Sequence, residues 1–453
     1  MEAVTEVVSK ASDYLWNVIL IILLCGTGIY FTIRLKFIQI RKFGEGFKLV
    51  FGNISLKGEK GKNGEMTTFQ SLATAIAAQV GTGNLAGAAT ALIGGGPGAI
   101  FWMWVSAFFG MSTIYAEATL AQQYKVKKDG GVTGGPVYYI RAAFKGTFGK
   151  ALAAIFAILI VLALGFTGNM VQSNSIGAAF SEVFSARNIE IPSIVFGLIL
   201  AAVIGFIFLG GVNRLASVVE KIVPIMAGIY IVGSLVLILM NITALPEAIK
   251  MIFVGAFNPE AVVGAGAGIA VREAIRFGVA RGLFSNEAGM GSTPHAHARA
   301  KVENPHKQGL AAMISVFIDT FIILNLTVFS ILTTGVLDSG KEGTALTQAA
   351  FTKGFGNFGD IFVAVCLLFF AFSTILGWHF FGEVNVKYLF GEKAAKFYSI
   401  LVIGFVIVGS TLKVQLVWSL SDFFNGLMVI PNAIALWALS GVVVKICKQY
   451  GKK

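Results

Sequence analysis

Two glycines and an asparagine interrupt an apolar stretch of the chain, and residues of these types at this spacing could bind ions. The segment from Gln79 to Asn84 reads Gln-Val-Gly-Thr-Gly-Asn and lies within the apolar run from Thr67 to Ile93. Glycine and asparagine both weaken a helix. Unwinding frees backbone carbonyl oxygens, which can bind a cation, and exposes the N-terminus of a half-helix, which can bind a carboxylate. Close helix packing through small residues is the alternative. A dinucleotide-binding loop is disfavoured because no strand precedes the glycines.

A second glycine-rich interruption is predicted at residues 277–283, which read Phe-Gly-Val-Ala-Arg-Gly-Leu. The surrounding segment, 264–298, carries Arg272, Glu273 and Arg276, so hydropathy alone would reject it as a membrane span. Cytoplasmic loops of membrane proteins are enriched in lysine and arginine. Most of the 35 lysines and arginines fall on one side of the membrane only if this segment crosses it. We therefore expect a crossing segment with a break inside it.

The composition places both interruptions in an integral membrane protein. The 453 residues are 56% hydrophobic and 13% charged, with mean hydropathy +0.79, whereas soluble domains are about 25% charged and about 45–50% apolar. The net charge of +12 comes from basic residues that flank apolar runs. These residues are therefore topology signals rather than a nucleic-acid surface. The three cysteines are widely spaced, which excludes a disulfide framework or a cysteine metal cluster.

Eleven apolar runs of about 20 residues are long enough to cross a bilayer. The predicted spans are 14–33, 66–93, 97–123, 150–181, 192–210, 216–241, 264–298, 308–334, 358–385, 396–411 and 418–444. The distribution of lysine and arginine puts the N-terminus outside and the C-terminus in the cytoplasm. The predicted fold class is thus an all-α polytopic protein of the cell membrane.

The two interruptions lie at matching positions in two halves of the chain. The predicted regions are an N-terminal span with a basic cytoplasmic loop (1–60), a first five-helix repeat with its break near 79–84 (61–241), an extracellular connection (242–263), a second five-helix repeat with its break near 277–283 (264–445) and a basic cytoplasmic tail (446–453). Because five is odd, the two halves have opposite orientations in the membrane. This is the inverted-repeat pattern of secondary transporters.

Three stretches of the sequence resemble the alanine/glycine:cation symporter family, also called sodium:alanine symporters. They are Thr-Gly-Asn-Leu-Ala-Gly at 82–87, Gly-Gly-Pro-Gly-Ala-Ile-Phe-Trp-Met-Trp at 95–104 and Gly-Leu-Phe-Ser-Asn-Glu-Ala-Gly-Met-Gly-Ser at 282–292. The resemblance covers nearly the whole chain. It implies a LeuT-like 5+5 inverted repeat of the APC superfamily, preceded by one extra helix, and sodium-coupled uptake of alanine or glycine. We expect co-transported sodium, no organic cofactor, and a chain that functions as a monomer in the lipid bilayer.

A zwitterionic substrate of this kind needs hydrogen-bond donors for its carboxylate and acceptors for its ammonium group. The first break supplies both, although capping of the half-helices is the alternative role for its side chains. Polar side chains in the fourth span face inward, where helix–helix hydrogen bonding is the alternative, and the seventh span completes the pocket. The predicted substrate-binding residues are Gln79, Gly81, Thr82, Gly83, Asn84, Thr167, Asn169, Phe277 and Gly278.

A sodium site is predicted beside the first break. Sodium prefers hard oxygen ligands, and two adjacent hydroxyls, Ser373 and Thr374, lie at mid-depth in the ninth span. By resemblance to the family, they join the backbone carbonyls of Ala77 and Val80. Hydrogen bonding of the hydroxyls back to their own helix is the alternative. Asp319, in the eighth span, is a further candidate cation ligand, because a carboxylate at mid-depth needs a partner; the alternatives are a proton relay and an ion pair with an arginine of the seventh span.

Charged residues toward the ends of spans are candidate gates. Arg272 and Arg276 share one helix face at i and i+4, so they could form an outer gate with Glu273 or another acid, or reach a water-filled vestibule. Glu117, toward the inner end of the third span, is predicted to anchor helices or to act as a gate.

Three histidines cluster at the inner end of the seventh predicted span. Histidines at close spacing could indicate a metal site, but no cysteine or acid completes a tetrahedral set. We therefore expect His295, His297 and His306 to lie on a solvated inner face.

These patterns predict a transporter and not an enzyme, because the sequence offers no convincing nucleophile–base set. The expected function is sodium-coupled import of alanine or glycine by alternating access. A proton-coupled amino-acid transporter, with Asp319 or Glu117 as the proton carrier, is the alternative. An ion channel is a third class, which no repeated filter motif supports.

Overall fold

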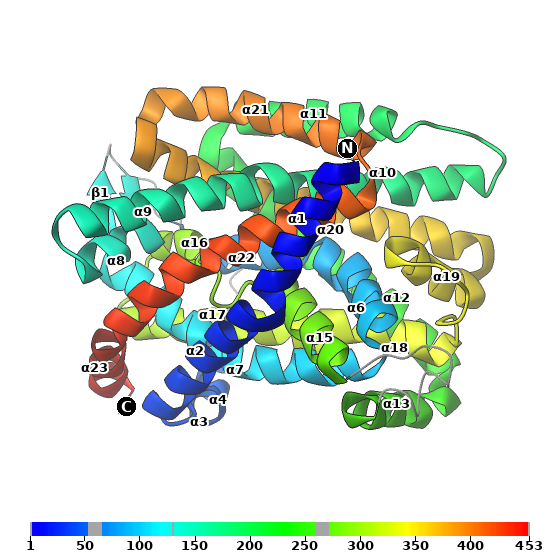
Figure 1. Cartoon of the computed structure of the whole chain (residues 1–453), viewed down its shortest axis with the longest axis horizontal. Helices are drawn as coiled ribbons and strands as arrows, with labels where there is room; N and C mark the ends of the chain where they lie inside the picture. Colours follow the sequence, from blue (N-terminus) through cyan, green and yellow to red (C-terminus); the bar gives the residue numbers. More distant parts are fainter. Residues whose placement is uncertain (1, 53–65, 129–130, 259–270, 452–453) are drawn as a thin grey trace.

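The computed structural model describes residues 2–52, 66–128, 131–258 and 271–451, and most of them are helical. Many of the long helices run roughly along the long axis of the molecule, and the rod formed by α1 and α2 crosses one face diagonally (Figure 1). The expected all-α class is therefore confirmed, apart from a short antiparallel hairpin of β1 (Val126–Lys128) and β2 (Gly131–Thr133). Parts of the predicted cytoplasmic loop (53–60), the extracellular connection (259–263) and the seventh span (264–270) lie outside the described residues, as do 452–453 of the tail.

The first part of the chain contains the elements that surround the first interruption; η marks a π- or 3₁₀-helical segment. Their bounds are α1 (Glu2–Tyr14), η1 (Leu15–Ile19), α2 (Leu20–Arg34), α3 (Ile38–Arg41), α4 (Phe43–Phe51), α5 (Thr68–Gln79), η2 (Gly83–Gly87), α6 (Ala88–Gly95), α7 (Gly98–Gln123), α8 (Pro136–Ala143), α9 (Gly146–Ile160), η3 (Val161–Gly168), α10 (Asn169–Ser185), α11 (Ser193–Phe208), α12 (Gly211–Met240), η4 (Ile242–Ala244) and α13 (Leu245–Phe257).

The second part of the chain contains the second interruption and the helices that pack around both. Their bounds are α15 (Val271–Asn286), α16 (Pro294–Arg299), α17 (Pro305–Val316), η5 (Phe317–Leu324), α18 (Asn325–Thr334), α19 (Gly343–Phe355), η6 (Gly356–Phe358), α20 (Gly359–Phe390), α21 (Glu392–Thr411), α22 (Val414–Ala438) and α23 (Ser440–Tyr450).

The first interruption lies between α5 and α6. α5 begins with a capping box, in which the side chains of Thr67 and Gln70 each accept a hydrogen bond from the other residue's backbone N–H. It ends at Gln79, and Val80 is extended, with ψ of 91°. The two half-helices differ in direction by 45°, so the chain is broken at the glycine-rich segment that the sequence singles out.

The second interruption lies later in the chain than predicted, and the break expected at 277–283 is wrong in position. α15 continues through that segment to Asn286. The backbone then turns at Glu287, Gly289 and Gly291, whose φ angles are +57°, +90° and +79°. Helix resumes at α16.

The glycines within α15 serve close packing instead of unwinding. A Cβ atom at Gly278 would collide with the carbonyl oxygen of Ala99 and would lie 2.9 Å from the Cβ of Trp102, both in α7. Small residues that let two backbones approach are typical of helix interfaces in membranes. Glycine spacing alone does not distinguish this role from a break.

Seven helices of the described chain are long and apolar enough to cross a membrane, and the bent α5–α6 pair makes an eighth. The helices α2 and α11 are apolar but shorter. The structure therefore describes a polytopic helical membrane protein.

Replacing Gly278 with alanine is expected to destabilise the protein by about 1–3 kcal/mol, because the added methyl group overpacks the contact between α15 and α7. Thermal unfolding of the purified protein in detergent measures the effect. Gly26→Ala is the matched control, since nothing lies within 4 Å of a Cβ at Gly26. Equal melting temperatures for the two variants would contradict the packing role.

Candidate functional site

The first interruption joins backbone amides to side chains of its own helix and of α10. The N–H of Gly81 donates to Oδ1 of Asn84 at 2.9 Å, and the N–H of Thr82 donates to Oε1 of Gln172 at 3.3 Å. Lipid offers no hydrogen-bond partners for the amides that an interruption frees. Asn84 therefore holds an amide that the interruption frees, close to the alternative role of capping considered for it.

Two hydroxyls of α20 face the carbonyl oxygens at the end of α5. The Thr374 hydroxyl lies 2.9 Å from the carbonyl oxygen of Ala77 and 3.4 Å from that of Val80, and the Ser373 hydroxyl lies 3.5 Å from that of Ala77. Both hydroxyls also reach the carbonyl of Phe370 in their own helix, at 2.9 and 3.0 Å. The carbonyls of Ala77 and Val80 lie at the end of α5, where the helical hydrogen bonds stop and the Gly81 N–H turns to Asn84 instead. The five oxygens, which we call the oxygen cluster, can therefore hold a hard cation.

The oxygen cluster contains one residue that the sequence analysis missed. Phe370 contributes a backbone carbonyl, and its position three and four residues before Ser373 and Thr374 is the signal that could have found it. The cluster also explains a glycine: a Cβ atom at Gly81 would collide with the Thr374 hydroxyl. Only glycine at this position lets α20 approach the interruption so closely.

Three of the predicted substrate-binding side chains contain a buried polar atom without a hydrogen-bond partner in the described chain. These atoms are Gln79 Oε1, Thr82 Oγ1 and Asn169 Oδ1. The amide nitrogens are held, because Gln79 donates to the carbonyl of Asn286 at 2.7 Å and Asn169 donates to that of Gly165 at 3.0 Å. A buried polar group without a partner costs about 1–3 kcal/mol, so these atoms favour a bound polar ligand or water.

The remaining predicted substrate-binding residues have other contacts. The Thr167 hydroxyl donates to carbonyls of its own helix at 2.9 and 3.0 Å. Gly83 packs against α15, where a Cβ would lie 2.9 Å from Cα of Ser285. Phe277 packs against the end of α6, and Gly278 faces α7. Gly83 of the interruption thus contacts α15 at Ser285, whereas Phe277 and Gly278 of α15 pack elsewhere, against α6 and α7.

Asp319 connects the two interrupted helices. Its Oδ1 accepts hydrogen bonds from Asn84 Nδ2 at 2.8 Å and from the Ser285 hydroxyl at 2.9 Å, while its Oδ2 accepts one from the Thr320 hydroxyl at 2.9 Å. Thr320 in turn accepts from Asn286 at 3.2 Å. The carboxylate is fully buried and has no ion-pair partner in the part of the chain that the structure describes. It is therefore available to a cation or a proton.

Two of the three arginines of α15 pair with other acids and the third, Arg272, is exposed, so the predicted alternative of an Asp319–arginine pair is wrong. Arg276 contacts Asp13 of α1, and its Nη1 lies 3.3 Å from Oε2 of Glu273. Arg281 forms a two-pronged ion pair with Asp422 of α22, with one of its two bonds at 3.0 Å. Asp13 and Asp422 lie far from α15 in the sequence, which is why sequence spacing did not reveal these two partners.

These ion pairs line a polar cavity of about 260 Å³ between α1, α15 and α22. The Arg281 guanidinium also lies 4.8 Å from the ring centroid of Trp418, and Trp16 donates to the carbonyl of Asp422 at 3.0 Å. Arg276 therefore bridges α15 and α1. Arg272 is exposed and outside this cavity.

Two more buried carboxylates organise the second interruption. Glu117 of α7 accepts hydrogen bonds from the N–H groups of Gly289 and Gly291 at 2.9 and 2.8 Å, and from Asn432 Nδ2 at 2.7 Å. Glu117 thus anchors the loop between α15 and α16. Glu287, which the sequence analysis did not single out, accepts from Trp378 Nε1 at 2.5 Å. Its place as the one charged residue of the motif at 282–292 was the available signal.

The prediction of a solvated histidine face is wrong. His295, His297 and His306 are each at most 1% exposed. They are hydrogen-bonded respectively to Asn385 at 2.8 Å, to Gln308 at 2.7 Å and to Tyr115 at 2.6 Å. The loop after α15 turns inward, which buries all three. No group of three metal-ligating side chains occurs among the described residues.

Two interrupted helices, buried carboxylates and an oxygen cluster in a bundle of apolar spans define a membrane transporter rather than an enzyme. The chain belongs to the sodium:alanine symporter family, whose pattern it matches over residues 1–453. It is 40% identical over 453 residues to the "Sodium/alanine symporter AgcS" of Methanococcus maripaludis, covering 99% of this chain and 97% of the relative.

Two other known proteins resemble this chain in sequence or in fold, and their names give glutamine and manganese as what they transport. The "Probable sodium/glutamine symporter GlnT" of Bacillus subtilis is 41% identical over 456 residues, which is 100% of this chain and 92% of that protein. A solved manganese transporter from Eremococcus coleocola has a TM-score of 0.54 at 14% identity, covering 87% of this chain and 82% of that one. The fold is thus that of a transporter, and the family is one of sodium symporters.

Replacing Glu117 with glutamine is expected to lower stability by about 1–3 kcal/mol, because an amide NH₂ would face a backbone N–H of Gly289 or Gly291 and leave it unsatisfied. The apparent melting temperature in detergent measures the loss. Glu303→Gln, at an exposed ion pair with Lys307, is the control. The anchoring role fails if the two substitutions shift the melting temperature equally.

Proposed function

We propose that this chain imports alanine or glycine by alternating access, coupled to the inward movement of sodium. The oxygen cluster is the observation that carries the proposal. Three backbone carbonyls and two side-chain hydroxyls from two separate helices meet there. Sodium is a hard cation that takes oxygen ligands of this kind. The names of the relatives support sodium as the coupling ion.

A sodium ion in the oxygen cluster would lie directly beside the residues proposed to bind the substrate. Ala77 and Val80 lie shortly before Gly81 and Thr82 in the chain, so a cation that fixes their carbonyls also fixes the interruption. Gln79 Oε1 offers an acceptor to a substrate ammonium group, and Thr82 Oγ1 offers a hydroxyl to a carboxylate. Coupling of this kind is reciprocal, so substrate must also tighten sodium binding.

Space at the interruption favours a small substrate. Gly83 packs against Ser285, and Gly81 packs against Thr374. A Cβ atom at Gly81 would also lie 3.3 Å from Gln172 Oε1. Alanine and glycine add the least bulk to such a site. Asn169, with its own unpartnered oxygen, is proposed as a further substrate contact from α10.

The proposed architecture has eleven crossing segments in an inverted five-plus-five arrangement after one N-terminal helix. The eight apolar spans account for most of it, and α1–α2, α11 and α15–α16 supply the remaining three. The second repeat begins with α15–α16 and its interruption at 287–293. With the N-terminus outside and the C-terminus in the cytoplasm, the ion pairs of Arg276 and Arg281 close the outer end of the pathway.

Movement between outward- and inward-open states is proposed to involve both interrupted helices together. Asp319 holds Asn84 of one and Ser285 of the other, and Gln79 bonds to Asn286. These contacts link the two helices at mid-depth, while Arg276 and Arg281 link α15 to α1 and α22 at its outer end. Breaking the outer ion pairs would let the linked pair move as a unit.

A proton-coupled transporter is the second candidate, favoured by the buried carboxylates. Asp319, Glu117 and Glu287 are fully buried and form no ion pair among the described residues. Under this mechanism Asp319 or Glu117 would carry the proton. Sodium coupling explains the oxygen cluster as well, so we take it as the principal proposal.

Replacing Thr374 with valine is expected to raise the sodium concentration for half-maximal alanine uptake about tenfold, which corresponds to about 1.4 kcal/mol. Valine keeps the shape and removes one ligand oxygen, whereas Thr374→Ser keeps the oxygen and should stay close to the wild type. Uptake into proteoliposomes at constant pH provides the measurement. Thr411→Val removes an exposed hydroxyl outside the cluster and is the control; a sodium dependence shared by both valine variants would refute the assignment.

Replacing Asp319 with asparagine is expected to slow uptake, because an amide NH₂ would face the donors of Asn84 or Ser285. The uptake that remains should still require sodium and should not respond to a pH gradient in sodium-free buffer. If the wild type accumulates alanine on a pH gradient alone, and Asp319→Asn abolishes that accumulation, the proton mechanism replaces the sodium one.

A further inference from the structure

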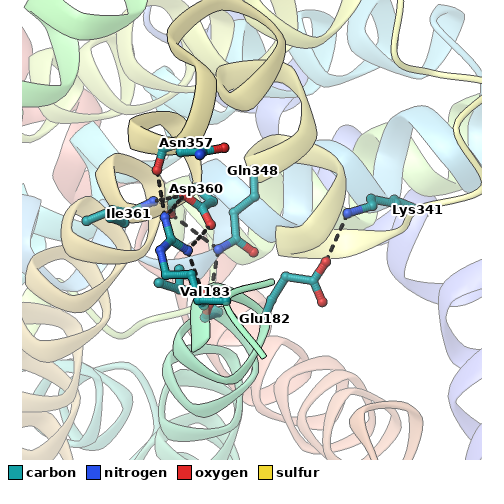
Figure 2. Close-up of polar contacts among 9 residues, drawn as sticks. Glu182, Val183, Lys341, Gln348, Asn357, Asp360 and Ile361 are labelled. Carbon is teal, nitrogen blue, oxygen red and sulfur yellow. Dashed lines mark hydrogen bonds and ion pairs between the residues drawn. The ribbon is translucent and has the colours of Figure 1, made fainter. Parts of the chain in front are cut away.

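A second polar cavity, of about 400 Å³, lies where the end of α10 meets α19 and the start of α20. It is separate from the oxygen cluster and from the cavity at Arg276. Two ion pairs border it: Arg187–Asp360, with Nη1–Oδ2 at 2.8 Å, and Lys341–Glu182, with Nζ–Oε1 at 2.9 Å. Figure 2 shows these pairs on either side of Gln348. In the proposed orientation the cavity opens to the outside.

On one side of the cavity, Arg187 is held in place by several hydrogen bonds. The guanidinium donates to both oxygens of Asp360, to the carbonyl of Val183 at 2.5 Å and to that of Asn357 at 2.6 Å. Its hydrogen bonds to Asp360 raise the pKa of Arg187. Four of the five guanidinium N–H groups and both Asp360 oxygens are therefore already engaged.

The other side of the cavity offers one buried hydrogen-bond acceptor without a donor in the described chain, Gln348 Oε1. Gln348 is 2% exposed, and its Nε2 donates to the carbonyls of Ala179 and Asp360 at 3.0 and 3.3 Å. Both of these partners are acceptors, which fixes the orientation of the amide. Its Oε1 therefore remains an acceptor with no donor in the described chain, and it points to the side on which Glu182 and Lys341 lie (Figure 2).

The charged groups around Gln348 Oε1 have both signs. Glu182 and Lys341 are each 44% exposed, so both can turn toward a ligand. Lys353 donates to the carbonyl of Thr334 at 2.5 Å and has no carboxylate partner within the described residues. An acceptor and a carboxylate suit an ammonium group, while two lysines suit a carboxylate.

We propose that this cavity binds a small zwitterionic amino acid outside the transport pathway, with its ammonium group on Gln348 and Glu182 and its carboxylate on Lys341 and Lys353. The ligand class rests on the proposed function, since it is that of the proposed substrate. Neither a bare cation nor a bare anion uses groups of both signs. The cavity volume exceeds what alanine or glycine needs, so small polar side chains also fit.

The position of α19 makes this site a means of regulation. Next to Gln348, the Thr347 hydroxyl donates to the carbonyl of Leu85 in η2 at 3.1 Å. The same helix therefore borders the cavity on one side and the first interrupted helix on the other. An amino acid held between Gln348 of α19 and Glu182 of α10 would restrain α19 against α10, next to the contact of α19 with η2.

Binding of radiolabelled alanine to the purified full-length protein tests the proposal. The wild type should show two phases, and Gly81→Val, which fills the first interruption, should lose the tighter one. The weaker phase should fall at least tenfold in affinity in Glu182→Gln and in Lys341→Gln. Both side chains are partly exposed, so these variants should fold, and thermal unfolding checks that they do. Glu247→Gln and Lys250→Gln, in an exposed pair elsewhere, are the matched controls.

A single binding phase in the wild type would overturn the second site, as would a weaker phase that the Glu182 and Lys341 variants leave unchanged or that the control variants abolish equally. Failure of the proposed function is a separate result: the wild type would then not accumulate alanine in proteoliposomes on a sodium gradient. Gln348→Met provides a further check, because it keeps the bulk and removes both the acceptor and the Nε2 donor to Ala179 and Asp360; it should likewise lower the affinity of the weaker phase at least tenfold, in protein that thermal unfolding shows to be folded.

Discussion

Backbone groups that an interrupted helix leaves free must find partners inside the protein, because the membrane supplies none. This constraint shapes both interruptions. At the first, side chains of Asn84 and Gln172 accept from the freed amides, and the hydroxyls of α20 meet the freed carbonyls. At the second, Glu117 accepts from the freed amides of Gly289 and Gly291.

The two interruptions are also tied to each other, and this link makes the arrangement suited to transport. Asp319 accepts hydrogen bonds from both interrupted helices, so a change at one reaches the other. A cation in the oxygen cluster would fix the end of α5 against α20. Binding of one ligand then orders the binding site of the other and increases its affinity, and coupled transport depends on this effect.

The sequence predicts the first site better than the second, for a physical reason. At 79–84 the glycines, asparagine and flanking polar residues all weaken the helix together, and the hydroxyls of α20 are conspicuous in an apolar run. At 277–283 the glycines look the same in sequence but face α7, and tertiary packing decides their role. The roles of Asp13 and Asp422 could not be predicted, because they depend on contacts between helices that are distant in sequence. The burial of the three histidines depends in the same way on the path of the loop after α15.

Equilibrium binding of radioactive sodium to the purified protein, with and without alanine, tests the central claim most directly. The account predicts saturable sodium binding that alanine tightens, and alanine binding that sodium tightens by the same factor. Absence of saturable sodium binding from folded protein, or alanine binding that is indifferent to sodium, would contradict the assignment of the oxygen cluster as the coupling site.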